Sequence, residues 1–301
     1  MKKSVNFFNR NIPIAADLYL PENFNENRKY AVIITCHPAS GCKEQTAGVY
    51  AEKLSKKGFV TLAIDASYQG ASGGEPRFIE EPSIRVEDIR CAVDYLVTLP
   101  YVDENRIGVL GFCAGGGYAA NAAMTERRIK AVGTVVAVNI GRLQRDEGQQ
   151  SILSTLETVS KQRTAEARGE EPMIVSWLPE NYKDSQNIDL REGYDYYRTS
   201  RGQHSNSPNK LYFTSLSSVI AFDAFHLADI LLTQPLLIIT CSTKGAFGAN
   251  KDGHKLYQKA ASAEKELIVM EEASHIDLYD KCEYVDKAVD KFTDFYQKFL
   301  V

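Results

Sequence analysis

The chain has 301 residues, of which 44% are hydrophobic and 25% are charged, and its formal net charge is −4. This length suits one large α/β domain with a full core, and a charge pattern without a basic stripe argues against a nucleic-acid partner. No uncharged apolar stretch of about 18 residues is present, so we expect no membrane-spanning helix. Six scattered cysteines and an N-terminus without an apolar segment indicate free thiols in the cytoplasm.

Strand-like and helix-like segments alternate in the first half of the chain. Residues 4–20 alternate polar and apolar side chains and predict an antiparallel hairpin at the edge of a sheet. The segments that follow are a buried strand at 30–35, a helix at 46–57, a strand at 59–64, a helix at 84–99, a strand at 107–112, a helix ending near residue 124 and a strand at 131–138. This order predicts a doubly wound, mostly parallel sheet of the α/β class.

The periodic pattern weakens after Gly141. A connection between core elements is usually only a few residues long, and Tyr, Leu and the single Trp are too frequent in residues 142–210 for disorder. We therefore predict a helical cap at 142–210, inserted into a core formed by 1–141 and 211–301. The core resumes with a helix near 218–231, a strand at 235–240, a helix at 251–261, a strand at 266–270 and an amphipathic helix at 280–300.

The segment 107–118 carries the most specific signal. An apolar run enters Gly-Phe-Cys-Ala-Gly, and an Ala-rich segment that can form a helix follows. This is the layout of a nucleophile elbow, a sharp strand-to-helix turn that presents one side chain above the sheet. Gly111 and Gly115 suit the turn because glycine tolerates backbone angles that other residues avoid. The side chain at the tip is Cys113, and we expect the helix N-terminus to lower the pKa of its thiol.

Four segments together resemble a known superfamily. They read Cys-His-Pro-Ala-Ser-Gly-Cys-Lys-Glu-Gln at 36–45, Asp-Ala-Ser-Tyr-Gln-Gly-Ala-Ser-Gly-Gly-Glu-Pro at 65–76, Gly-Phe-Cys-Ala-Gly-Gly-Gly-Tyr at 111–118 and Ser-His-Ile-Asp-Leu-Tyr-Asp at 274–280. The chain resembles the α/β hydrolases, and within them the branch related to dienelactone hydrolases, from about residue 10 to its C-terminus. The resemblance implies the α/β-hydrolase fold and a cysteine nucleophile, but no particular substrate, because this superfamily hosts many chemistries.

A catalytic base is expected at His275. In α/β hydrolases the nucleophile comes first in the chain, the acid second and the histidine last. His275 follows the last predicted strand, where the base belongs, and imidazole can take the proton of the Cys113 thiol and return it to a leaving group near neutral pH.

Two backbone N–H groups are needed to hold the oxyanion that develops during acyl transfer. One is expected at Ala114, which follows the nucleophile. The other is expected at Ala39, with Ser40 close behind, because this turn follows the strand at 30–35. We expect His37 to support the same turn.

The third member of a catalytic triad is left open. The resemblance places an Asp or Glu just beyond the strand at 235–240, but the first carboxylate there is Asp252, which is our leading candidate. Asn139, at the end of an earlier strand, is the alternative, and it would give a Cys-His-Asn set. Asp223 and Asp277 are weaker candidates. A cysteine nucleophile also tolerates a simple Cys-His dyad, because a thiolate forms more readily than an alkoxide.

Other polar residues are expected to be structural. We predict that Asp65 holds the turn at 65–76 through bonds to its backbone, and that Arg85 and Asp88 form a solvated or loop-bracing pair. We expect no cofactor and no metal site, because three histidines lack the spacing of metal ligands, namely His204, His226 and His254.

The sequence thus predicts a hydrolase that acts on a small-molecule carboxylic ester, lactone or thioester through an acyl-enzyme on Cys113. An acyltransferase with the same Cys-His site and a non-catalytic ligand-binding protein are the alternatives. Redox sensing through Cys113 is a further one, with Cys36, Cys42 or Cys241 as the resolving thiol. The oligomeric state is left open, a homo-oligomer included.

Overall fold

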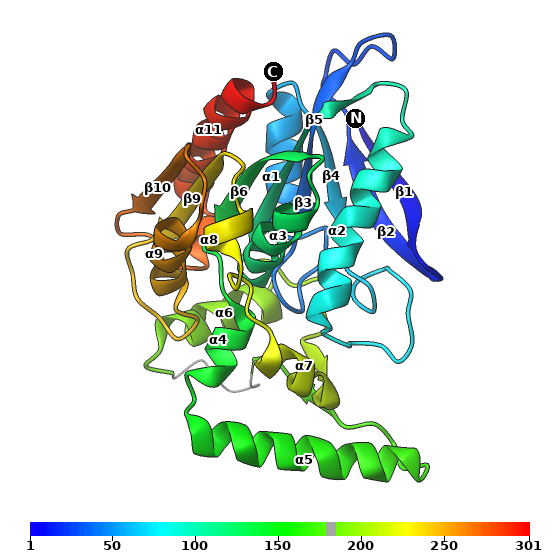
Figure 1. Cartoon of the computed structure of the whole chain (residues 1–301), viewed down its shortest axis with the longest axis vertical. Helices are drawn as coiled ribbons and strands as arrows, with labels where there is room; N and C mark the ends of the chain where they lie inside the picture. The colour runs from blue at the N-terminus through cyan, green and yellow to red at the C-terminus, as the bar shows by residue number, and fades with distance from the viewer. Residues whose placement is uncertain (179–184) are drawn as a thin grey trace.

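One eight-stranded sheet organises the molecule in the computed structural model, which describes residues 1–178 and 185–301 (Figure 1). The strand order is β1-β2-β4-β3-β5-β6-β9-β10. All neighbours from β4 to β10 pair in parallel, whereas β1 pairs with β2 and β2 pairs with β4 in antiparallel. The strands are β1 (Lys2–Asn9), β2 (Ile12–Tyr19), β3 (Tyr30–Cys36), β4 (Val60–Ile64), β5 (Val102–Phe112), β6 (Ile129–Val135), β9 (Leu236–Cys241) and β10 (Lys265–Met270). The mostly parallel sheet with its antiparallel edge hairpin confirms the predicted fold class.

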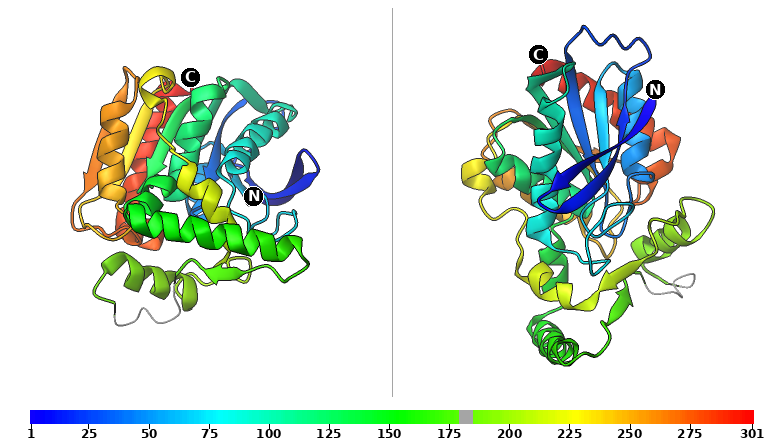
Figure 2. Two further views of the ribbon diagram at one scale, coloured as in Figure 1. Left: turned by 60° about the horizontal axis from the view of Figure 1, so that its bottom comes forward. Right: turned by 90° about the vertical axis from the view of Figure 1, so that its right-hand side faces the viewer.

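Helices cover both faces of the sheet (Figure 2). Alternate residues of the fully buried strand β3 enter two separate cores, Val32 and Ile34 on one face and Ile33 on the other. The first core is completed by α2 (Pro82–Val97), α3 (Ala114–Thr125) and α9 (Ala249–Lys259), and the second by α1 (Thr46–Lys56) and α11 (Cys282–Phe299). None of the helices in the described ranges is both long and apolar enough to cross a membrane.

The chain between β6 and β9 forms an insertion at one end of the molecule, and α5 lies farthest from the sheet (Figure 1). The predicted cap, residues 142–210, falls within it; we keep the term cap for these residues, of which 179–184 lie outside the described part. Besides helices the insertion holds a small antiparallel pair, β7 with β8. Its elements are α4 (Ile140–Arg145), α5 (Gln149–Ala167), β7 (Ile174–Ser176), α6 (Ile188–Arg198), β8 (Lys210–Tyr212), the 3₁₀ helix η1 (Phe213–Ser215), α7 (Leu216–Ala221) and α8 (Ala228–Leu231).

The continuous helix predicted near 218–231 is wrong. Two short helices, α7 and α8, are separated by a turn in which side chains bind backbone groups. Asp223 Oδ1 accepts the N–H of Phe225 at 3.0 Å, and Asn139 Oδ1 accepts the N–H of Ala224 at 3.2 Å. Such side-chain acceptors compete with the helical hydrogen bonds and end the helix. Similarly, the last helix begins at Cys282, because residues 277–280 form a separate short helix, α10 (Asp277–Asp280).

Candidate active site

Cys113 lies at the turn between β5 and α3, with a backbone φ of 52°. A positive φ is costly for a residue with a side chain and is kept where the surroundings enforce it. Here the Cys113 N–H donates to Val135 O at 3.1 Å, and the Cys113 carbonyl accepts the N–H groups of Gly116 and Val138, each at 2.9 Å. These bonds hold the strained residue between two parallel strands and the first turn of the helix.

Gly111 and Gly115 are required at this turn for space, not for their backbone angles. Neither has a positive φ, but a Cβ atom on Gly115 would overlap the carbonyl oxygen of Cys36, and one on Gly111 would overlap the carbonyl oxygen of Gly115. The first turn of α3 therefore sits directly against the ends of β3 and β5. This close approach brings Cys113 next to the loop that leaves β3.

The loop after β3 is braced from below by buried side chains. The His37 ring accepts the N–H of Ala66 at Nε2 (3.0 Å) and donates from Nδ1 to Pro38 O (2.6 Å), while Arg85 donates to His37 O at 2.8 Å. Burial and the Arg85 charge hold the pKa of His37 well below its usual value, so the ring stays neutral. His37 therefore supports the turn, as predicted.

The neighbouring acidic residues are structural as well. Asp65 accepts the N–H groups of Lys43 (2.7 Å) and Ala71 (2.8 Å), which confirms its predicted role in the turn. Asp88 is buried and accepts the N–H of Ser67 at 2.8 Å. It is a brace and not a solvated group, and Arg85 contacts a different carboxylate.

The two expected oxyanion donors belong to loops at the same cavity. Ala39 and Cys113 both line it, and the Ala39 N–H donates no hydrogen bond to any residue in the described ranges. The Ala114 N–H, at the start of α3, lies close enough to the Cys113 sulfur to lower the pKa of the thiol.

The Tyr279 side chain lies between Cys113 and His275. Nε2 of His275 is 3.0 Å from the Tyr279 hydroxyl, and the same hydroxyl lies close enough to the Cys113 thiol to lower its pKa. All three side chains lie at the carboxyl end of the sheet, and the His275 ring packs edge-on against the ring of Phe247, with 5.0 Å between centroids. The structure thus brings the expected nucleophile and base together through a tyrosine.

The sequence analysis did not single out Tyr279. Its signal is the spacing: Tyr279 follows His275 by four residues, and the turn at His275 continues into α10, which brings the tyrosine hydroxyl to the imidazole. Both belong to the segment 274–280 that carries the resemblance.

The Cys113–His275 pair is neutral at rest. Burial raises the pKa of the Cys113 thiol to about 12, although the Tyr279 hydroxyl and the Ala114 N–H both act to lower it. Burial also lowers the pKa of His275 to about 3. The expected depression of the thiol pKa by the helix N-terminus is therefore wrong, because desolvation of the thiolate outweighs the helix.

The structure does not bring Asp252 or Asn139 to His275. Asp252 is buried in an ion pair with Arg142, which donates to it from Nη2 at 2.6 Å and from Nε at 3.1 Å. Asn139 caps α4 and donates to Asp223 at 2.6 Å. Nδ1 of His275 is buried and has no hydrogen-bond partner among residues 1–178 and 185–301.

Asp277, the nearest carboxylate in sequence, serves its own helix. Its Oδ2 accepts the N–H of Ser274 at 3.2 Å, and Lys281 Nζ lies 2.6 Å from Oδ1. These contacts fix the start of α10 and do not reach the imidazole of His275.

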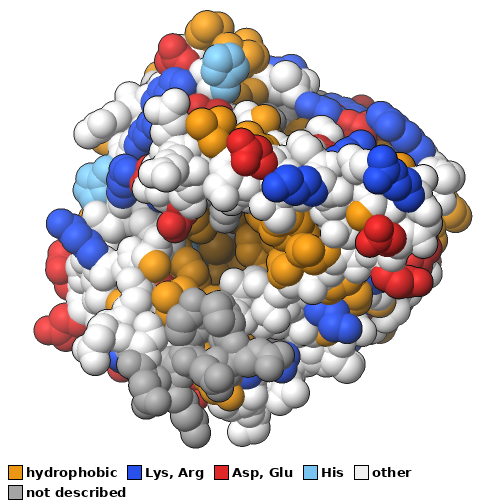
Figure 3. Space-filling model, turned by 90° about the horizontal axis from the view of Figure 1, so that it is seen from below, with side chains coloured by type: hydrophobic (Ala, Val, Ile, Leu, Met, Phe, Trp, Pro, Cys, Tyr) orange, Lys and Arg blue, Asp and Glu red, His pale blue; other side chains and the backbone are white. Residues whose placement is uncertain are grey.

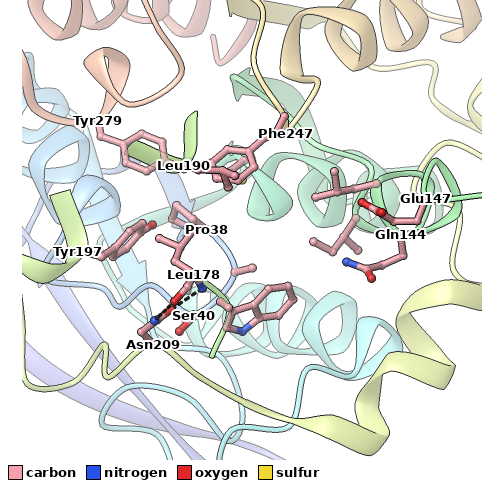
Figure 4. Close-up of a pocket in the computed structure, with 16 residues that line it drawn as sticks. Pro38, Ser40, Gln144, Glu147, Leu178, Leu190, Tyr197, Asn209, Phe247 and Tyr279 are labelled. Carbon is pink, nitrogen blue, oxygen red and sulfur yellow. Dashed lines mark hydrogen bonds between the residues drawn. The ribbon is translucent and has the colours of Figure 1, made fainter. Parts of the chain in front are cut away.

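A mostly apolar cavity of about 290 Å³ opens above Cys113, between the core loops and the cap. Figure 3 shows this hollow lined with hydrophobic side chains, and Figure 4 shows how the lining residues surround it. Asn209 and Leu178 join two cap segments at its edge by a pair of hydrogen bonds. The apolar wall includes Pro38, Ile140, Leu143, Trp177, Leu178, Leu190, Phe247 and Tyr279, and the polar groups include Gln144 and Glu147.

One cluster of metal-type ligands lies away from this cavity. Atoms of Cys42, Glu44 and His204 lie within 4.8 Å of one another. The Glu44 carboxylate already binds Lys43 Nζ at 2.5 Å, and His204 Nδ1 accepts the N–H of Asn206 at 3.2 Å. We assign no metal to these residues.

Comparison with known proteins places the chain in a family. Residues 14–154 match the model described as the dienelactone hydrolase family. YcjY, an uncharacterized protein of Escherichia coli K12, is 44% identical over the full length of both chains. PA2218 of Pseudomonas aeruginosa is 35% identical over 99% of this chain and 81% of its own. Its crystal structure superimposes with a TM-score of 0.91, covering 99% of this chain and 94% of that one.

A fungal protein is similar over a shorter range. A thiohydrolase of Eupenicillium brefeldianum is 26% identical over 71% of this chain and 69% of its own.

The Asp252–Arg142 pair gives a test that separates a structural role from a catalytic one. Asp252→Ala leaves the guanidinium buried and unpaired, so we expect a loss of roughly 3–5 kcal/mol in the free energy of unfolding, measured with urea. Replacing both residues, as Asp252→Leu with Arg142→Met, is expected to restore most of the lost free energy of unfolding. A stable but inactive Asp252→Ala protein would instead identify Asp252 as the catalytic acid.

The neutral pair predicts how Cys113 reacts as pH changes. Because its thiol pKa is raised to about 12, we expect the rate of alkylation by iodoacetamide to rise steadily to pH 10, without a plateau. Mass spectrometry of the Cys113 peptide separates this rate from that of the other cysteines. A rate that levels off near pH 6 would show a thiolate–imidazolium pair and contradict the neutral assignment.

Proposed function

Because the chain belongs to the dienelactone hydrolase family of the α/β-hydrolase superfamily, we propose that it hydrolyses a carboxylic ester, lactone or thioester through an acyl-enzyme on Cys113. The observation that carries the proposal is the position of Tyr279, which lines an apolar cavity together with Cys113 and binds Nε2 of His275. In this proposal Cys113 is the nucleophile, Tyr279 relays its proton to the base His275, and the N–H groups of Ala39 and Ala114 bind the oxyanion.

Acylation begins when the substrate carbonyl carbon lies above the Cys113 sulfur. The sulfur attacks the carbon while its proton passes to the Tyr279 oxygen and the tyrosine proton passes to Nε2 of His275. The N–H groups of Ala39 and Ala114 hold the negative oxygen of the tetrahedral intermediate. Collapse of the intermediate breaks the bond to the leaving alcohol or thiol, which takes the proton from His275.

Deacylation reverses the proton path. A water molecule attacks the thioester carbon and gives its proton to His275, and the tetrahedral intermediate then expels the Cys113 sulfur, which is reprotonated. The products are a carboxylic acid and the regenerated neutral pair, so no other reactant is consumed.

The neutral resting pair makes His275 essential to the mechanism. With a thiol pKa near 12 and an imidazole pKa near 3, almost no thiolate exists before the substrate binds. Proton transfer must therefore accompany attack, which is general-base catalysis and not attack by a preformed thiolate. This also protects the thiol from oxidation in the absence of substrate.

The cavity supports an apolar acyl group. Trp177, Leu190 and Phe247 line its wall, and the carboxylate of Glu147 stands at its edge. A hydrocarbon chain gains by leaving water for such a surface, whereas an anionic acyl group would meet Glu147. The name of the fungal relative, a thiohydrolase, supports a thioester as one leaving-group class.

Acyl transfer is the second candidate. The apolar, cap-covered cavity limits access of water to the acyl-enzyme, so an alcohol or amine that binds there can take the acyl group from the same intermediate.

Kinetics with p-nitrophenyl butyrate and a short acyl thioester test the proposal. We expect Cys113→Ala and His275→Ala each to lower kcat/KM at least about a thousandfold, because each removes a member of one catalytic unit. Tyr279→Phe is expected to lower kcat more than it changes KM, because it interrupts only the proton path.

Cys282→Ser, at an exposed cysteine that does not line the cavity, is the matched control and should leave the rates unchanged. Activity that survives in Cys113→Ala would refute the proposed nucleophile. Tight binding of substrate without turnover by the wild type would identify a ligand-binding protein.

A further inference from the structure

Asp189, in the first turn of the cap helix α6, places a buried carboxylate against the loop that follows β9. Its side chain is almost fully buried, and Oδ2 accepts the N–H of Phe247 at 2.7 Å. A Cβ atom on Gly245 would overlap this carboxylate. The loop after β9 thus leaves a space at Gly245, and the Asp189 carboxylate of the cap fills it.

Two buried polar atoms near Phe247 lack partners. Oδ1 of Asp189 and Nδ1 of His275 are both buried without a hydrogen bond to any described residue. Phe247 contacts both groups, since its N–H binds Asp189 and its ring packs against the His275 imidazole. One atom is an acceptor and the other, when Nε2 serves as the base, is a donor.

Phe247 also lines the cavity together with Leu190, the residue next to Asp189 (Figure 4). Buried polar atoms are usually hydrogen-bonded, so each unpaired one calls for an explanation. Here an acceptor lies at the backbone of Phe247 and a donor lies against its ring, and pairing of the two would satisfy both.

We propose that Asp189 is the acid that positions His275, and that it is supplied by the cap and not by the loop after β9. The inference rests on the proposed function. The Asp189 carboxylate accepts the Nδ1 proton of His275, directly or through one water molecule, when an acyl group fills the cavity. Catalytic hydrogen bonds are often long in substrate-free enzymes and shorten in the complex.

The other carboxylates near this loop have partners of their own. Glu192, one turn along α6, accepts the hydroxyl of Ser274. Asp252 is paired with Arg142, and Asp277 with Lys281. Oδ1 of Asp277 also accepts no hydrogen bond, but it lies 2.6 Å from Lys281 Nζ in an ion pair. Oδ1 of Asp189 has neither a hydrogen bond nor an ion pair to any described residue.

The charge on Asp189 is sensitive to its surroundings. Its pKa is raised to about 6, chiefly by burial and to a lesser extent by the nearby Glu192, although the Phe247 N–H acts to lower it. The negative charge of Asp189 raises the pKa of two nearby thiols, Cys113 and Cys241. The carboxylate is therefore ionised at neutral pH and above, where it stabilises the imidazolium that forms during attack.

The test compares Asp189→Asn with Asp195→Asn, an exposed carboxylate on the same helix. We expect Asp189→Asn to lower kcat/KM by about a hundredfold and to shift the acid limb of its pH profile downward, because the imidazole loses the charge that favours its protonated form. Asp195→Asn should leave both unchanged.

Alkylation of Cys113 by iodoacetamide at pH 8 gives a readout that does not depend on turnover. If Asp189 acts only as a charge near the thiol, its neutralisation lowers the thiol pKa and speeds alkylation. If it acts by positioning His275, Asp189→Asn slows alkylation. The two roles therefore predict opposite changes in the rate of alkylation.

Stability separates positioning from folding. A carboxylate whose pKa is raised by burial destabilises the folded state above its unfolded pKa, so Asp189→Asn should unfold in urea at pH 8 at the same or a higher midpoint than the wild type. Full kcat/KM, an unshifted acid limb and faster alkylation in Asp189→Asn would overturn the inference. That result, with Cys113→Ala inactive, would leave the proposed function intact.

Discussion

The close contact between the first turn of α3 and the end of β3 is the constraint on which the site depends. Gly115 lies so near the carbonyl oxygen of Cys36 that no side chain fits. This contact fixes the strained backbone of Cys113 and sets the thiol beside the loop that carries Ala39. Parallel pairing of β3 with β5, in which Cys36 lies opposite Gly111, holds the same geometry from the sheet. The backbone alone thus determines the position of the Cys113 thiol, and the cavity, Tyr279 and the cap are arranged around it.

Burial gives this position its chemical character. The same apolar surroundings raise the pKa of the Cys113 thiol and lower that of His275, so both groups wait in their neutral forms. A buried site of this kind gives no rate enhancement until a substrate is bound. The carbonyl oxygen of the substrate is then the atom on which negative charge develops. In the mechanism we propose, Tyr279 then provides the path for the proton, and the cap carboxylate of Asp189 provides the charge that balances the imidazolium. Reactivity is thereby tied to the presence of substrate.

The parts of the account that follow from local sequence were predictable. The apolar run of β3 specified the central strand, and the glycines around Cys113 specified the turn and its tip residue. The thiol pKa was not predictable, because desolvation depends on a cap whose packing does not follow from its composition. The position of Asp252 in the chain suggested an acid, but Arg142, 110 positions earlier in sequence, binds it in the folded protein. The break in the helix predicted near 218–231 likewise depends on Asn139, a residue distant in the chain.

The central claim is that an acyl group passes through Cys113. Its most direct test is to mix the protein with an acyl thioester, stop the reaction in acid within the first turnovers, and map the modified peptide by mass spectrometry. The account predicts the mass of the acyl group on the peptide that contains Cys113, and no such adduct in Cys113→Ala. Product formation at the wild-type rate with an unmodified Cys113 peptide, or with the acyl group on another residue, would contradict it.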